Sequence, residues 1–508
     1  MAIKSQKTLL IKNIGYNFLI QVCLLLLFMI TTPIVIHGLG NEAYGILSIV
    51  LVIVGYFGFL DLGMTQASVK FLSEHLARGE KKQVYQVVST SIFTNLVLGV
   101  LGGILIALFA PLFAEKIFKV SPSFQDEAKL AFYIFAVGFP AVLIQGTLQA
   151  IPTAFQRFDI INIINGIAGT LQALGAMTLV LLGFGLREVV ISYLIVRILS
   201  ASFYLFILHN LLPDFQLRPM WHRPTFVRLI HFGGWVLVST LVGPLMVNFD
   251  RVFIGSLLSV VAVTYYVVPY GMVSKLGIIY GSAMPVLFPA FSERAALPDK
   301  ASFKSLLLRS TEFLLVTLTP LVLIVIVFAG EILKVWMGAD FAQRSAVVAQ
   351  ILAFTILVNG FATIPYTAVQ GAGRPDITAK FHLIELPVYI GLCLLLIPLL
   401  GINGAALAWA IRATMDVSLL FYFAKKLTSL KLQEIFSNSF KLKFSIVLVF
   451  GLSLFLIKTF IFNIAICGAL ILVSLAFYAI GLWLYGLNET DKSFFIGFKS
   501  RLFKRVTQ

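Results

Sequence analysis

Charged residues are scarce in this chain, and their scarcity excludes an ordinary soluble domain. Only 12% of the 508 residues are charged, 59% are hydrophobic, and the mean hydropathy is +0.99. In an ordinary soluble domain about 25% of the residues are charged. The composition therefore predicts an integral membrane protein.

Cysteines and catalytic motifs are also scarce. The three cysteines, Cys23, Cys393 and Cys467, lie far apart in apolar segments, so we expect neither a disulfide framework nor a cysteine metal site. The motifs GxxxxGK[ST], HExxH and GxSxG do not occur. The polar stretches between apolar segments are too short for a soluble catalytic domain. We therefore expect a transporter rather than an enzyme, with no cofactor and no metal.

Long apolar windows are what the sequence has in quantity. They run from residues 13–36 to residues 465–486, and most are long enough for a helix to cross the hydrocarbon core, the shortest being the thirteenth at residues 444–457. The predicted fold class is an all-α integral membrane protein with about 14 transmembrane helices. Two GxxxG patterns occur, at Gly99 and Gly103 and at Gly277 and Gly281, and they predict close packing within the fold rather than dimerisation.

The basic residues predict the orientation. Most of the 38 Lys and Arg fall in loops on the side of the N-terminus, so both termini are expected in the cytoplasm. The formal net charge of +16 reflects this bias, and the expected partner is the membrane, not nucleic acid. Residues 487–508 alternate phenylalanine with Lys and Arg and are expected to lie in the inner interface.

The two halves of the chain resemble each other. An ungapped alignment sets Gly58 over Gly277 and SEHLARGEK (residues 73–81) over SERAALPDK (residues 292–300). A second match between the halves aligns Arg157 and Asp159 with Arg374 and Asp376. Each Arg-Asp pair lies in the loop before the fifth helix of its half.

This repeat predicts two six-helix lobes, residues 1–213 and 226–428, followed by an added helix pair at 440–486. Because six is an even number, both lobes have the same orientation and should be related by a pseudo-twofold axis along the membrane normal. Two such lobes can enclose a central cavity, which is an architecture of transporters.

Several basic residues lie deep in the apolar windows. A charge at a helix centre costs about 2.5 to 3.5 kcal/mol on insertion scales, so each needs a cavity, a partner or a route to the interface. The helical rise places Arg197 and Arg412 roughly 12 to 13 Å from the outer ends of their helices. Lys275 is also deep, and Arg251 lies nearer the outer end of its helix. Together these four predict a cavity that binds an anion.

Acidic residues share the same windows, and each has two interpretations. Asp61, close to the midplane, either binds a coupling ion, H+ or Na+, or braces a bend between Gly58 and Gly63. Asp416 either balances the cavity or neutralises Arg412 one turn away. Asp250 either has a coupling role or pairs locally with Arg251. Glu385 is expected at a gate or at the surface.

The eighth predicted helix joins tyrosines to a hinge candidate. Pro269 removes a backbone hydrogen bond and favours a kink. Tyr266 and Tyr270 flank it, and their hydroxyls suit contacts with sugars, although an aromatic packing face gives the same pattern.

Four segments resemble a known family. HGLGNEAYGILSIVLVIVGYFGFLDLGMTQASVKFLSE is similar to the N-terminal signature of the polysaccharide transporter family, the O-antigen type flippases of the multidrug/oligosaccharidyl-lipid/polysaccharide exporter superfamily. NFDRVFIGSLLSVVAVTYYVVPYGMVSKLGIIYGSAMPVLFPAFSE resembles its helix 7 and 8 region, and AFQRFDIINIIN and VQGAGRPDITAK resemble its loops between the fourth and fifth helix of each half.

The resemblance implies transfer of an undecaprenyl-diphosphate-linked oligosaccharide from the inner to the outer leaflet of the bacterial inner membrane by alternating access. It also implies a polysaccharide polymerase and a chain-length regulator as partners. A multidrug and toxin extrusion antiporter and a lipid II-type flippase stay open as alternatives. So do a membrane enzyme acting on lipid-linked glycan and a scaffold without transport activity.

Overall fold

The computed structural model is helical throughout the part of the chain that it describes. It describes residues 23–487 apart from 216–220, 296, 298–299, 429–433, 435–436 and 462, and it leaves the side chains of 235–247 and 285–286 undescribed. No strand occurs among these residues. The all-α prediction is confirmed, while the predicted interfacial tail at 487–508 lies outside the described residues apart from its first residue.

Twelve helices are long and apolar enough to cross a membrane, judged by length and composition over the described residues. Two further helices match the remaining predicted windows. One is the shorter apolar helix Cys23–Leu39, and the other is α8 (Arg223–Leu257), a helix of 35 residues. The chain is thus a multi-pass membrane protein with about as many spans as the apolar windows predict.

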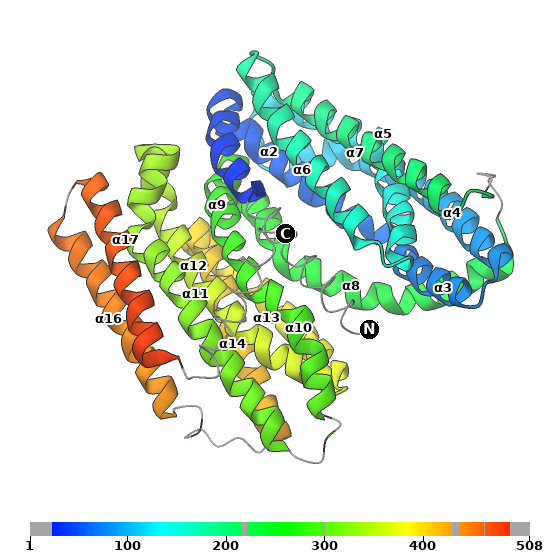
Figure 1. Ribbon diagram of the computed structural model, residues 1–508. Coiled ribbons are helices and arrows are strands. Elements are labelled where there is room, and N and C mark those ends of the chain that lie inside the picture. The colour runs from blue at the N-terminus through cyan, green and yellow to red at the C-terminus, as the bar shows by residue number, and fades with distance from the viewer. Residues whose placement is uncertain are drawn as a thin grey trace, which may run out of the picture. The chain divides into compact units, whose positions relative to one another are not determined.

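The chain folds into two compact units, residues 1–268 with 382–408 and residues 269–381 with 409–508. Unit 1 includes the following helical elements after Cys23–Leu39 (Figure 1): α2 (Asn41–Phe57), η1 (Gly58–Asp61), α3 (Met64–Ala77), α4 (Lys81–Leu112), the short η2 (Phe113–Ile117) and η3 (Pro122–Phe124), α5 (Gln125–Ala154), α6 (Phe158–Leu181) and α7 (Leu186–Leu211). Helix α8 also belongs to it.

Unit 2 contains the helices of the second half that follow Pro269: η4 (Lys275–Gly277), α10 (Ile278–Ala295), α11 (Lys300–Met337), α12 (Ala339–Gly371), α16 (Asn438–Phe460) and α17 (Ile464–Gly481). Three helices pass from one unit to the other: α9 (Val260–Ser274), α13 (Pro375–Leu400) and α14 (Ile402–Thr428). The compact units therefore differ from the sequence lobes 1–213 and 226–428, whose pseudo-twofold relation stays a prediction.

Small residues let helices of unit 1 approach closely. A Cβ on Gly99 of α4 would lie 2.5 Å from the Cα of Pro140 on α5, and one on Gly103 would lie 2.3 Å from the carbonyl oxygen of Ala136. Both distances are far below van der Waals contact, so only glycine fits. The GxxxG prediction of close packing is confirmed for this pair. It is not confirmed for Gly277 and Gly281, since a Cβ on Gly281 would meet nothing within 4 Å and one on Gly277 would meet the nearby side chain of Tyr280.

Each half has a broken helix at the matched place. In the first half, α2 passes into the tight turn η1, and Leu62 (φ 50°) and Gly63 (φ 71°) then take left-handed backbone angles before α3 begins. In the second half, α9 gives way to η4 before α10 begins. Since Gly58 and Gly277 were paired by the sequence repeat, the break itself is part of the repeat.

The added helix pair belongs to unit 2. Helix α16 lies against α11 and α17 lies against α16 (Figure 1). Buried apolar side chains join the three helices, among them Leu315, Phe450 and Tyr478. The pair is therefore a packed part of this unit.

A buried ion pair fixes one end of α16. Lys443 donates to the Glu312 carboxylate of α11 at 2.6 Å, and both side chains are nearly inaccessible. The hydroxyls of Ser439 and Ser437 donate to the same carboxylate at 2.9 and 3.2 Å. Near the other end, Lys458 pairs with Glu331 at 3.3 Å, but there both side chains are partly exposed.

We expect Glu312→Leu to destabilise unit 2 by about 3 to 5 kcal/mol, because it leaves the Lys443 ammonium buried without its carboxylate. The double variant Glu312→Leu with Lys443→Met should recover most of that loss. Thermal unfolding of the purified chain in detergent measures both. The control Glu331→Leu, in the exposed pair, should cost about 0 to 1 kcal/mol. Equal losses in the two single variants would contradict this account.

Candidate functional site

The two deep arginines occupy similar settings in the two halves. In unit 1 the Arg197 guanidinium on α7 donates to Gln145 Oε1 on α5 at 3.5 Å. In unit 2 the Arg412 guanidinium on α14 donates to Asn359 Oδ1 on α12 at 3.5 Å. Each arginine on the sixth helix of its half thus meets a carboxamide on the fourth.

Each of these bonds engages one N–H of a guanidinium. A distance of 3.5 Å is long for an N–H donor, whose usual range is about 2.7 to 3.2 Å. A guanidinium carries five N–H donors, and each bond uses one. Arg197 is exposed, whereas Arg412 is 7% exposed. Both guanidinium groups are therefore oriented by a hydrogen bond, with Arg197 exposed and Arg412 buried.

Asp416 follows Arg412 by one turn of α14 and is also 7% exposed. It lies close enough to the Tyr366 phenol to act on it electrostatically. Pairing between Asp416 and Arg412, expected from their spacing, stays a prediction.

Asp61 closes the broken helix of unit 1. Its carboxylate accepts the backbone N–H of Thr65 at 3.0 Å and the Thr65 hydroxyl at 3.0 Å, so it caps the first turn of α3. It also accepts from Asn95 Nδ2 of α4 at 2.7 Å. Asn95 is fully buried and donates to the Thr147 hydroxyl of α5 at 2.6 Å as well. The bracing role is present in this geometry, and the coupling role stays a prediction.

Asp250 and Tyr266 form a buried pair within unit 1. The Tyr266 hydroxyl donates to Asp250 Oδ2 at 2.5 Å, and the backbone N–H of Arg251 donates to Oδ1 at 2.7 Å. Both side chains are nearly inaccessible. Tyr266 thus makes its hydroxyl contact with a carboxylate of its own unit.

Arg251 lines a pocket of about 230 Å³ in unit 1, between α2 and α8. Its guanidinium is also near enough to the phenols of Tyr44 and Tyr56 to act on them electrostatically. Four basic residues were predicted to line a cavity. Among the residues that the structure describes, Arg251 is the one of these four that lines this pocket.

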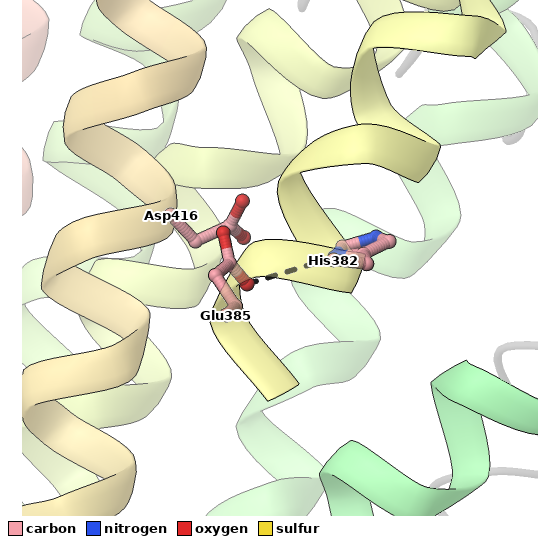
Figure 2. A group of neighbouring side chains, drawn as sticks. All are labelled: His382, Glu385 and Asp416. Atoms are coloured by element: carbon pink, nitrogen blue, oxygen red, sulfur yellow. Dashed lines mark ion pairs between the residues drawn. The ribbon is translucent and has the colours of Figure 1, made fainter. Parts of the chain in front are cut away.

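The other predicted residues of the second half lie elsewhere. Tyr270 packs its ring against the indole of Trp409, with ring centres 5.5 Å apart. Lys275 begins η4 and is half-buried. Figure 2 shows His382 and Glu385 on α13, with 3.6 Å between His382 Nδ1 and Glu385 Oε2. Glu385 is fully buried, so its expected surface position is wrong for this structure, while a gating role stays a prediction.

Two arginines outside the spans form matched surface pairs. Arg157 meets Asp159 at 2.9 Å, and Arg374 meets Asp376 at 2.9 Å, each just before a helix begins. The hydrogen bonds that Arg157 and Arg374 donate to these carboxylates raise the pKa of each arginine above its usual value. The matched Arg-Asp residues of the two halves therefore form the same ion pair in each half.

Four polar residues that the sequence analysis passed over belong to these clusters: Asn95, Gln145, Thr147 and Asn359. The available signal was an uncharged polar side chain in an otherwise apolar window. Such side chains need a partner in hydrocarbon, as charges do.

We expect Gln145→Met and Asn359→Leu to weaken substrate binding by about two- to tenfold each, since a lost hydrogen bond of 0.5 to 1.5 kcal/mol frees the arginine from its productive orientation. The readout is the substrate concentration for half-maximal transport, with thermal unfolding unchanged. The matched control is Gln350→Met, because Gln350 donates to the Ile326 carbonyl and to no arginine. A loss as large in the control would contradict a positioning role.

Known structures with the same fold cover nearly the whole chain. One reported as the lipid II flippase MurJ in an inward closed conformation aligns with a TM-score of 0.73, 15% identity, and coverage of 92% of this chain and 98% of that one. A structure described as the inward-facing conformation of a multidrug resistance MATE family transporter of the MOP superfamily aligns with a TM-score of 0.68, 13% identity, and coverage of 81% of this chain and 98% of that one. At these identities the likeness is one of fold.

Sequence comparison is more specific. A Shigella flexneri protein described as a candidate O-antigen transporter is 28% identical over 394 residues, which cover 77% of this chain and 92% of that protein. The profile of the family described as Polysaccharide biosynthesis protein matches residues 39–346, more than half of the chain. The chain therefore belongs to the Polysaccharide biosynthesis protein family.

Proposed function

We propose that this protein is a flippase that moves an undecaprenyl-diphosphate-linked oligosaccharide from the cytoplasmic to the outer leaflet by alternating access. The observation that carries the proposal is the oriented guanidinium on the sixth helix of each half, Arg197 and Arg412, in a chain of this family. The similar Shigella flexneri protein described as a candidate O-antigen transporter supports a glycan cargo.

The chemistry of the cargo fits these groups. A lipid diphosphate carries negative charge and several acceptor oxygens, and guanidinium binds such oxygens with two parallel hydrogen bonds. The lipid tail has no need to leave the hydrocarbon, whereas the glycan and diphosphate need a polar route. Lys275 and the tyrosine-bearing helix α9 would add contacts along it.

The cellular setting is part of the same proposal. The positive-inside bias supports both termini in the cytoplasm, and the family supports a bacterial inner membrane. The delivered oligosaccharide would then be the substrate of a polysaccharide polymerase with its chain-length regulator.

The experiment is flipping of a lipid-linked oligosaccharide in proteoliposomes. Arg197→Ala and Arg412→Ala should each lower it by about ten- to a hundredfold, because a hydrogen bond to a charged group is worth about 1.5 to 3 kcal/mol. Arg78→Ala is the matched control, since Arg78 pairs with Glu74 at an exposed helix end. Full activity in both cavity variants would reject the proposal, and drug resistance conferred by the wild-type chain would favour an antiporter instead.

We also propose that an H+ or Na+ gradient drives transport through Asp61. Its carboxylate accepts from the Thr65 hydroxyl of α3 and from the Asn95 carboxamide of α4, and Asn95 in turn donates to Thr147 of α5, so loading Asp61 with a cation would alter the brace of the broken helix. Asp61→Asn keeps the shape and one acceptor oxygen but removes the charge.

We expect Asp61→Asn to keep the fold and to lose the dependence of flipping on the gradient, measured in proteoliposomes with imposed pH or Na+ differences. Asp340→Asn is the control, because Asp340 is exposed and pairs with Arg344 on the same helix. Unchanged rates and ion dependence in Asp61→Asn would leave Asp61 with the bracing role alone.

A further inference from the structure

Helix α11 of unit 2 is interrupted twice. Pro320 lies inside the helix, and Phe328, about two turns later, has backbone angles outside the helical region (φ −110°, ψ 20°). A proline has no N–H, and its ring pushes against the carbonyl four residues earlier, which in α11 is that of Val316. A residue with non-helical angles likewise disturbs the hydrogen bonds that span it. Carbonyls of α11 beside these two points therefore need donors from outside the helix.

The added helix pair supplies the donor at the first interruption. The Tyr478 hydroxyl of α17 donates to the Val316 carbonyl at 2.7 Å, and this bond is buried. Val316 is the residue whose carbonyl loses its helical donor to Pro320. The ring of Tyr478 packs on Phe450 of α16, with ring centres 5.1 Å apart. The position of the hydroxyl is thus fixed by the other helix of the pair.

Lys458 of α16 contacts both sides of the second interruption. Its ammonium donates to the Val327 carbonyl, directly before Phe328, at 2.5 Å. It also donates to the Glu331 carboxylate, after Phe328, at 3.3 Å. Lys458 therefore joins the two segments of α11 that Phe328 separates.

Helix α16 follows α11 in a constant register. Its two lysines, Lys443 and Lys458, each donate to the residue of α11 that lies 131 positions earlier, Glu312 and Val327. Because the spacing is the same on both helices, they run side by side in the same direction between these points (Figure 1). The added pair is therefore fixed to α11 before the first interruption and at the second.

We propose that α16 and α17 form a brace that holds α11 in its twice-interrupted shape, with Tyr478 and Lys458 as positioning residues. Each supplies a hydrogen-bond donor to a carbonyl beside an interruption, where the backbone of α11 does not. In a bilayer such carbonyls are satisfied by neighbouring helices, since lipid offers no donor. The brace keeps the shape of unit 2 defined, and it does not depend on the identity of the cargo.

A double-mutant cycle in the detergent-purified full chain tests the first contact. Tyr478→Phe keeps the ring and removes the hydroxyl, so the Val316 carbonyl loses its donor and the midpoint of thermal unfolding should fall by about 2 to 6 °C. Pro320→Ala restores a backbone N–H four residues after Val316. In the Pro320→Ala chain, Tyr478→Phe should lower the midpoint by less than half as much. Equal reductions in the two chains would overturn the brace at Pro320.

Tyr204→Phe is the matched control. Tyr204 is also buried, but its hydroxyl donates to Asn165 in unit 1. Its effect on the midpoint should be the same in the wild-type and Pro320→Ala chains, because distant sites without shared partners are additive. If Tyr204→Phe depended on Pro320→Ala as strongly as Tyr478→Phe does, the coupling would reflect general destabilisation, and the proposal would be rejected.

Spin labels measure the shape of α11 separately from its stability. Arg309→Cys and Val335→Cys place labels at exposed positions before and after both interruptions, in a chain whose three native cysteines are replaced by serine. Pulsed electron paramagnetic resonance should give a narrow distance distribution in this chain and in its Tyr204→Phe variant. Combining Tyr478→Phe with Lys458→Met should broaden it, because neither interruption is then braced. An unchanged width in the combined variant would overturn the proposal, whether or not the proline variant folds.

Discussion

A charged or polar side chain within the hydrocarbon must find its partner in the same bundle, because lipid offers none. This constraint accounts for the polar clusters of both units. Arg197 and Arg412 each donate to a carboxamide oxygen. A carboxamide is uncharged, so this hydrogen bond orients the guanidinium without cancelling its charge.

The same constraint explains why the helix break of unit 1 is stable. A non-glycine residue in the left-handed region costs about 1 to 3 kcal/mol, and Leu62 is such a residue. Asp61 offsets that cost by accepting three hydrogen bonds, each worth about 0.5 to 1.5 kcal/mol, or more because the carboxylate is charged. The two magnitudes are comparable, so the break depends on the state of one carboxylate.

Much of this fold follows from the sequence, and the exceptions have a physical cause. Helix number, the repeated break at Gly58 and Gly277, and the tight contact at Gly99 and Gly103 depend on local composition and were predictable. The carboxamide partners Gln145 and Asn359 were not, since these helices are apolar nearly all round and carry no stripe that fixes which face meets which neighbour. The burial of Glu385 was missed for the same reason. The position of Glu385 near the end of a helix indicated how deep the residue lies in the membrane, but not toward which neighbour its side chain points.

The passage of the chain between the two compact units adds a mechanical argument. It occurs inside three helices rather than in loops, after Val268, Phe381 and Ala408. In α9 the next residue is Pro269, which removes a backbone hydrogen bond and so weakens the helix there.

In alternating access, packed units move against each other while each keeps its own hydrophobic core. A helix shared by both units can accommodate that change where its hydrogen-bond ladder is already interrupted. Pro269 supplies that interruption between Tyr266, whose hydroxyl is held by Asp250 in unit 1, and Tyr270, whose ring packs on Trp409 in unit 2. The tyrosines on either side of the proline are thus anchored to different units, which concentrates any bending of α9 at the residue least able to resist it.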